Sequence, residues 1–184
     1  MSEPESARQS ALAIIRGEHA AFDGALSWIR GHLALTRAHR IAPDAGTFEQ
    51  GLAFIATFME SFHHPKEDEF LFKAVRERTR EADEVLANLQ QQHAQMPEQF
   101  RILRLALSGT RQGAASQLDD FADLVGRFAD AQIEHMSLES GVFAMAERVL
   151  KPLDWGAIDV AFRANRDPLF GAGGGGLGSI MTRR

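Results

Sequence analysis

The 184-residue sequence contains no cysteine and no tyrosine. Without cysteine there can be no disulfide, no thiolate metal ligand and no cysteine nucleophile, and this absence fits a reducing, cytoplasmic location. Without tyrosine no site can use a phenolic hydroxyl as a hydrogen-bond donor or a radical carrier. These absences leave histidine and carboxylate side chains as the candidate ligands of any metal site.

Long apolar runs, strand patterns and excess positive charge are also missing. No run approaches the roughly 20 apolar residues of a membrane-spanning helix, and the N-terminal MSEPESARQS has no apolar signal core. Period-two alternation is nearly absent, which disfavours β-sheet. The net charge of −5 suits no nucleic-acid surface, and helix faces that mix acids and bases disfavour membrane binding. We therefore expect an all-α cytoplasmic protein that binds neither nucleic acid nor membrane.

Apolar residues recur three and four positions apart through most of the chain, which predicts amphipathic helices. The four long helices are expected at about Glu5–Leu35, Thr47–Val75, Glu81–Leu107 and Ser116–Leu150. Short connections make consecutive helices antiparallel neighbours, so residues 1–150 are predicted to form an up-down-up-down four-helix bundle. An apolar face left on such a bundle could also pair in a homodimer.

The chain beyond the bundle divides into two parts by composition. Residues 151–170 are expected to form an extension with a short helix, Leu153–Arg163, whose Trp155 and Phe162 pack on the end of the bundle. Residues 171–184, GAGGGGLGSIMTRR, have too few apolar side chains to order themselves and are expected to be a flexible tail. A phosphate-binding loop is disfavoured there, because no lysine and helix follow the glycines.

Four histidines, His19, His63, His93 and His135, each lie in an apolar series on a different predicted helix. The spacing within these series is close to seven residues, or two helical turns, so each series follows one helix face. A bundle buries a face this apolar, and buried imidazoles need polar partners. Each histidine lies roughly 20–28 Å from its loops at 1.5 Å per residue, so the four rings can meet mid-bundle around a metal.

Two carboxylates extend this histidine group. Glu67 and Glu139 each follow one of the histidines by four residues, a spacing that places both side chains on one helix face. Six convergent ligands exceed the four of a structural zinc site and suit two metal ions with open positions, iron first and manganese second. A phenylalanine-rich surround is expected to keep water out of this site: Phe22, Phe58, Phe62, Phe70 and Phe100.

Other interpretations of these residues stay open. A single histidine on an apolar stripe is usually a hydrogen-bonded core residue, so a metal-free helical interaction protein is an alternative to a metal site. His32 and His39 are expected at the surface, and Glu18 and Glu134, which precede two of the four histidines, are expected to be solvated. His64 could reach the metal from the side, support another ligand or be exposed.

Two prolines lie beside the candidate ligands. Pro65 falls between His63 and Glu67, and Pro97 lies one turn after His93. Each proline removes a backbone hydrogen bond from its helix. Either the second helix ends at His64 and a new one begins, in which case the His63–Glu67 pair loses its geometry, or the helix kinks near the metal.

Three segments together resemble the hemerythrin-like (HHE cation-binding) domains: HHPKEDEFLF from His63, QQH ending at His93, and EHMSLES around His135. The resemblance covers about Ser10–Leu150, and DPLFG from Asp167 is similar to endings in bacterial members. It implies an antiparallel four-helix bundle with a non-haem di-iron centre, oxo- or hydroxo-bridged, in which manganese or zinc could substitute. The implied ligands are His19, His63, Glu67, His93, His135 and Glu139, with the two glutamates bridging the ions.

The sequence departs from the oxygen-carrying hemerythrins at two places. Those carriers place a second histidine on the third helix where Leu89 and Pro97 stand here, and an aspartate five residues after the last histidine, where Glu139 lies at four. His64 could replace the missing imidazole. The resemblance therefore favours a protein that binds, reduces or senses oxygen, peroxide or nitric oxide over a reversible carrier. The alternative is an iron-handling or regulatory module without turnover.

Overall fold

The computed structural model describes residues 3–39, 44–110 and 115–164, and these residues are almost entirely helical, with no β-strand among them. Nine consecutive elements cover them: α1 (Glu3–His39), α2 (Ala45–Phe58), η1 (Met59–His63), α3 (His64–Lys66), η2 (Glu67–Phe72), α4 (Lys73–Arg78), α5 (Asp83–Thr110), α6 (Ala115–Val149) and α7 (Pro152–Arg163). The predicted all-helical class is confirmed. No helix in the described part of the chain is long and apolar enough to cross a membrane.

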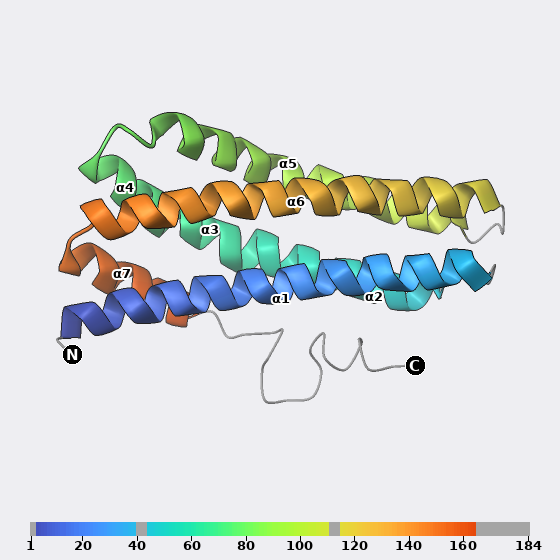
Figure 1. Ribbon diagram of the computed structural model, residues 1–184, viewed down its shortest axis with the longest axis horizontal. Coiled ribbons are helices and arrows are strands. Elements are labelled where there is room, and N and C mark those ends of the chain that lie inside the picture. Colours follow the sequence, from blue (N-terminus) through green and yellow to red (C-terminus); the bar gives the residue numbers. More distant parts are fainter. Residues whose placement is uncertain (1–2, 40–43, 111–114, 165–184) are drawn as a thin grey trace.

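The long helical rods lie lengthwise beside one another, and the short helix α7 lies against α1 (Figure 1). The first rod is α1, the second is the run from α2 to α4, the third is α5 and the fourth is α6. The first rod contacts the fourth and the second, while α5 contacts both α6 and α2. The predicted ends of the long helices lie within about four residues of the observed ones, as expected for helix ends that fray.

The second rod passes through Pro65 without a break. Asp44 caps its start, accepting hydrogen bonds from the backbone N–H groups of Gly46 and Thr47. Right-handed helical backbone angles continue through the junctions at His64 and Glu67. The turns on either side of Pro65 are wider, π-helical ones, as in the His64 N–H bond to the Met59 carbonyl, five residues earlier. Of the two alternatives, a helix that ends at His64 is therefore wrong. The wider turns accommodate the missing donor within one continuous helix.

Proline also fails to break α5. This helix runs from Asp83 to Thr110 with Pro97 inside it, on an exposed part of its surface. At the fourth rod, Pro152 lies beyond the end of α6 as expected, but it also begins α7, where a first-turn proline costs no hydrogen bond.

The apolar core consists of two clusters separated by a layer of polar side chains. The first cluster contains Phe22, Leu52, Phe100 and Phe121, and the second contains Ile15, Leu71, Phe72, Leu86 and Phe143, together with others from the same helices. On each rod one candidate histidine falls in the gap between the two clusters. We call these four residues, His19, His63, His93 and His135, the histidine layer.

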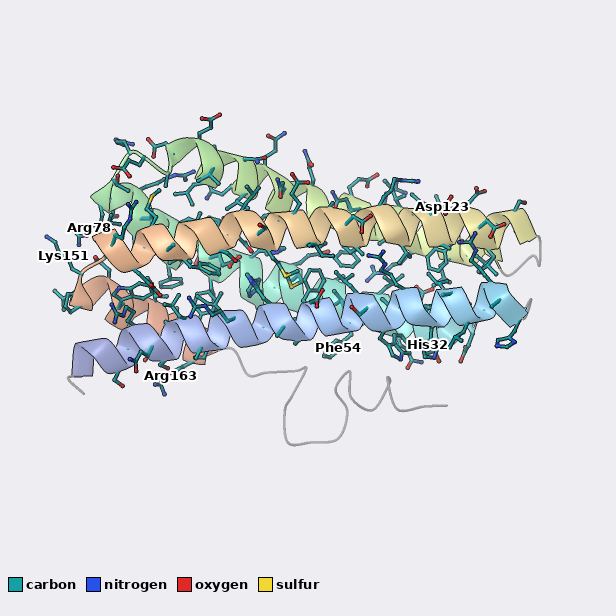
Figure 2. All side chains as sticks on the ribbon, viewed as in Figure 1. His32, Phe54, Arg78, Asp123, Lys151 and Arg163 are labelled. Carbon is teal, nitrogen blue, oxygen red and sulfur yellow. The ribbon has the colours of Figure 1, made fainter. Side chains whose placement is uncertain are left out.

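The short helix α7 packs its apolar side chains into the second cluster. Trp155, Ile158 and Phe162 are buried in that cluster, and α7 lies along α1 (Figure 1). Asp154 fixes the start of α7, because it accepts two hydrogen bonds from Arg78 and one from the Lys151 backbone. Figure 2 shows Arg78 and Lys151 at this same end of the molecule. The predicted glycine-rich tail, residues 171–184, lies outside the described residues.

Candidate metal centre

The structure brings the six predicted ligands together in the gap between the two apolar clusters. The histidine layer is buried, and Glu67 and Glu139 have no solvent exposure at all. Each side chain comes from a long helical rod that packs into the first cluster on one side of the ligand and into the second cluster on the other. This packing fixes the position along the rods at which the ligands meet. The predicted convergence at mid-bundle is therefore what the structure shows.

A first ligand set joins the first two rods. The Nε2 atoms of His19 and His63 lie 3.0 Å apart. Glu67 follows one turn after His63, and its two carboxylate oxygens lie 3.6 Å from His19 Nε2 and 3.5 Å from His63 Nε2. The continuous helix through Pro65 preserves this His–Glu pair, which a break at His64 would have separated.

A second ligand set joins the third and fourth rods. The Nε2 atoms of His93 and His135 lie 3.2 Å apart. Glu139 Oε1 lies 3.0 Å from His135 Nε2 and 3.5 Å from His93 Nε2. This set therefore repeats the first one, with two imidazoles and a carboxylate that follows one of them by a helical turn.

The two carboxylates connect the two ligand sets. Glu139 Oε2 lies 3.3 Å from His19 Nε2 in the first set, and Glu67 Oε2 lies 3.7 Å from His93 Nε2 in the second. Each glutamate thus faces imidazoles of both sets. Each carboxylate can therefore serve as a metal ligand together with imidazoles of either set.

His64 is a further buried candidate at the second set. Its ring stacks on that of His93, with centroids 3.9 Å apart and planes 11° apart, and its Nε2 atom is buried without a hydrogen-bond partner. Ligand atoms of His64, His93 and His135 lie within 4.8 Å of one another. The expected alternative of an exposed His64 is wrong, because its position after His63 in the wider helical turns directs it inward.

Three imidazoles are held at their other ring nitrogen by residues from a different rod. His63 Nδ1 lies 2.7 Å from Glu18 Oε2, His93 Nδ1 lies 3.2 Å from Asp68 Oδ1, and His135 Nδ1 lies 2.8 Å from Gln92 Oε1. We call Glu18, Asp68 and Gln92 the outer partners. The predicted solvated Glu18 is therefore wrong, and helix periodicity does not mark Asp68 or Gln92 as site residues. The signal available was that each one directly adjoins a predicted ligand in the chain.

The donor set fits a cation between its members. A carboxylate or amide oxygen at Nδ1 must accept a hydrogen bond, so His93 and His135 carry their protons there. In the neutral rings both Nε2 atoms then present lone pairs to each other across 3.2 Å. The oxygens of Glu67 and Glu139 are likewise buried without a hydrogen bond, although imidazole nitrogens lie close by. Metal cations would satisfy all of these electron pairs together.

Burial also sets the charge state of the metal-free site. Desolvation, and after it the nearby His63, lowers the pKa of His19 to about 3, and the same cause lowers the pKa of His64 well below its usual value. Desolvation and the neighbouring Glu139 raise the pKa of Glu67 well above its usual value. Desolvation works against ionised Glu139 too, but the nearby imidazoles of His135 and His93 outweigh it and lower the pKa of Glu139. Cations would allow both glutamates to ionise.

These shifts predict how acid destabilises the metal-free protein. The folded chain binds a proton at His19 less tightly than the unfolded chain does, so this contribution to stability is present above pH 6.5 and is lost as pH falls toward about 3. Between about pH 7.5 and pH 5, His19 should account for a loss of roughly 2 kcal/mol in the free energy of unfolding. Urea unfolding of chelator-treated protein at the two pH values measures the loss.

The control for this pH dependence compares two variants. His19→Gln should lose the part of the pH dependence of stability that comes from His19. The pKa of Glu67 is shifted in the opposite direction, and Glu67 is present in both the wild type and this variant. His39→Gln, at an exposed position, should keep the full slope. Identical slopes for wild type and His19→Gln would contradict the assignment.

The aromatic surround differs from the predicted one. Phe58 stacks on His63 as expected, but Phe70 is 36% exposed. Three other phenylalanines, which the sequence reasoning did not select, have rings against the ligand imidazoles: Phe72 on His93, Phe143 on His19 and Phe162 on His63. These rings keep the site apolar on the side of the second cluster.

The remaining sequence expectations concern residues outside the site. His39 and Glu134 are exposed, as expected. His32 is half-buried, because its ring packs 4.3 Å from that of Trp28 and 6.3 Å from that of Phe48. His32 lies toward the end of the molecule opposite Arg78 (Figure 2). Its ring packs against the edge of the first apolar cluster there and is not a fully exposed surface side chain.

Comparison with known proteins agrees with this geometry. The family model described as the Hemerythrin HHE cation binding domain matches residues 10–146, which include both ligand sets and end before α7. No curated protein and no solved structure matches the chain. Because the family match spans most of the sequence and contains every candidate ligand, the chain belongs to the hemerythrin HHE cation-binding family.

Proposed function

We propose that this protein holds two iron ions between its two ligand sets and uses them to bind, reduce or sense a small ligand, namely oxygen, peroxide or nitric oxide. The observation that carries the proposal is the position of Glu67 and Glu139, each buried and each facing imidazoles of both sets. One tetrahedral ion would leave several of these donors unused, since a structural zinc site takes four ligands. Imidazole and carboxylate ligands with open positions favour iron, with manganese or zinc as substitutes.

We further propose that the four rods form the up-down-up-down antiparallel bundle. The order of colours along the rods in Figure 1 supports it, since each successive rod runs back along the previous one. The contacts of α1 with α6 and of α5 with α2 agree, because they are neighbours in such a bundle. This arrangement supplies each ligand set with residues from two adjacent rods.

The residues of the chain have distinct tasks in this proposal. His19 and His63 would hold one ion, His93 and His135 would hold the other, and the two glutamates would bridge them. His64 would add a third imidazole to the second ion, which makes the two ions unequal. The apolar clusters exclude bulk water, and the absence of tyrosine leaves no phenol to take part. A pair of iron ions would supply up to two electrons for a bound diatomic or peroxide.

Metal analysis together with an optical spectrum tests the proposal. Protein expressed in iron-supplemented medium should contain about two iron ions per chain and show the near-ultraviolet absorption of a bridged ferric pair. Loss of that absorption on adding peroxide or nitric oxide, with repeated turnover, would identify a reducing activity. A stable, reversible change would identify a binding or sensing role. Protein that folds but contains no iron would contradict the di-iron proposal.

A second function, an iron-handling or regulatory module without turnover, is favoured by one observation. The oxygens of Glu67 and Glu139 and the Nε2 of His64 are buried without hydrogen bonds when no cation is present. Metal occupancy would therefore control the stability of the fold, which is what a sensor of iron needs. This function predicts a strong effect of iron on stability and no consumption of peroxide or nitric oxide.

A further inference from the structure

The outer partners follow a regular pattern through the bundle. Glu18 directly precedes His19 on α1, yet it holds His63 on the second rod. Asp68 directly follows Glu67 on the second rod and holds His93 on the third. On the third rod, the residue before His93 is Gln92, which holds His135 on the fourth. Each of the first three rods thus supplies a ligand and, from the adjoining position, a support for a ligand on the next rod.

We propose that Glu18, Asp68 and Gln92 are positioning residues that tune the metal pair, with two anionic carboxylate acceptors and one neutral amide acceptor. This inference rests on the proposed di-iron function. A hydrogen-bond acceptor at Nδ1 fixes which ring nitrogen is free for a metal, and it also fixes the direction in which that nitrogen points. An anionic acceptor draws the Nδ1 proton more strongly than an amide does, so the imidazole becomes a stronger ligand.

The geometry distinguishes the three supports from incidental surface contacts. The Glu18 carboxylate is only 11% exposed and lies 2.7 Å from its partner nitrogen, the distance of a charge-assisted hydrogen bond. The Gln92 amide is oriented by Asn88, whose side-chain oxygen accepts a hydrogen bond from Gln92 Nε2. Gln92 Oε1 is therefore directed toward His135. Asp68 is 29% exposed, with a longer contact of 3.2 Å.

The neutral partner Gln92 gives the inference a sharp test, because charge can be removed at one support and added at another. Glu18→Gln keeps an oxygen acceptor at His63 but removes the charge, so His63 becomes a weaker ligand for ferric iron and the midpoint potential of the pair should rise. Gln92→Glu adds a charge at His135, so the potential should fall. The exposed Asn88 can turn its amide to donate to the new carboxylate.

Glu134→Gln is the matched control. Glu134 directly precedes His135, as Glu18 precedes His19, but its side chain is exposed. The substitution makes the same change of charge one residue away from a ligand, so it should leave the midpoint potential unchanged. If the lost charge acted only through general electrostatics, Glu134→Gln and Glu18→Gln would instead shift the midpoint potential by similar amounts.

The experiment uses full-length protein loaded with ferrous iron, whose iron content is determined before a spectroelectrochemical titration. We expect Glu18→Gln and Gln92→Glu to keep their iron and their midpoint potentials to shift in opposite directions. Glu18→Ala should lose about 10- to 100-fold in iron affinity. Shifts of the same sign, or no shift in either protein, would overturn the inference. If Glu18→Gln fails to fold, the direction found for Gln92→Glu decides alone. Wild-type protein without iron would contradict the proposed function itself, whereas iron-loaded variants with unchanged potentials would contradict only the tuning.

Discussion

Replacing His93 with alanine is expected to abolish the binding of at least one of the two iron ions. The Nε2 atom of His93 lies close to His135 Nε2 and to oxygens of both glutamates, so the substitution removes a ligand that faces both ligand sets. Its ring also lies between those of His64 and Phe72, with centroids 3.9 and 5.7 Å away. The loss of iron affinity should exceed the 10- to 100-fold that is typical of losing an outer support.

The control for this prediction is His39→Ala, which removes an exposed imidazole at the end of α1. It should leave the iron content and the optical spectrum of the protein unchanged. Elemental analysis gives the number of ions per chain, and circular dichroism shows that both variants keep their helices. Equal iron loss in the two variants would refute the ligand assignment, since His39 is the last residue of α1 and lies well beyond His19 along that helix.

The positions of the candidate ligands could be predicted because they depend on helix periodicity alone. A histidine in an apolar series must lie on the buried face of its helix, and the distance to a loop sets its level along the bundle. The structure adds the reason why the four rings stay at that level. Residues before and after His19, such as Ile15 and Phe22, belong to different apolar clusters, and the other three rods repeat this division.

The outer partners could not be predicted in the same way, because they depend on how the rods are rotated about their axes. Glu18 lies about 100° around α1 from His19, which would face solvent on an isolated helix. In the bundle this direction faces the second rod, where His63 presents its Nδ1 atom. Periodicity assigns one buried stripe to a helix, whereas a helix with neighbours on two sides buries a wider surface.

The wide turns around Pro65 explain a further error. A π-helical turn contains more residues than an α-helical turn, so the residues after it lie at different angles from those that regular spacing predicts. Phe70 was expected to face the site, but the buried side chains in η2 are Glu67, Leu71 and Phe72. Phe72 stacks against His93, and Phe70 is left partly exposed. Sequence spacing alone does not reveal such turns, although Pro65 indicated the part of the helix where regular hydrogen bonding would be interrupted.

Removing the metal is expected to lower the melting temperature by a large amount. An ion held at a concentration 1,000 times its dissociation constant stabilises the fold by about 4 kcal/mol. For a domain of this size that corresponds to roughly 8–16 °C for each ion. Calorimetry of the iron-loaded protein, before and after treatment with a chelator, measures the difference. His39→Ala should show the same loss as wild type, whereas His93→Ala should show a much smaller one, because it begins with fewer ions.

The two apolar clusters determine how the metal-free protein should behave. They lie on either side of the histidine layer and contain no ligand, so they should keep the chain helical after the metal is removed. The layer between them, however, would hold Glu67 and Glu139 without hydrogen bonds to their buried oxygens. We therefore expect the chelated protein to retain its far-ultraviolet circular dichroism and to exchange backbone amide hydrogens faster near the layer than in the clusters. An unchanged melting temperature with uniform exchange would show that these carboxylates need no cation, and would contradict a metal role for the layer.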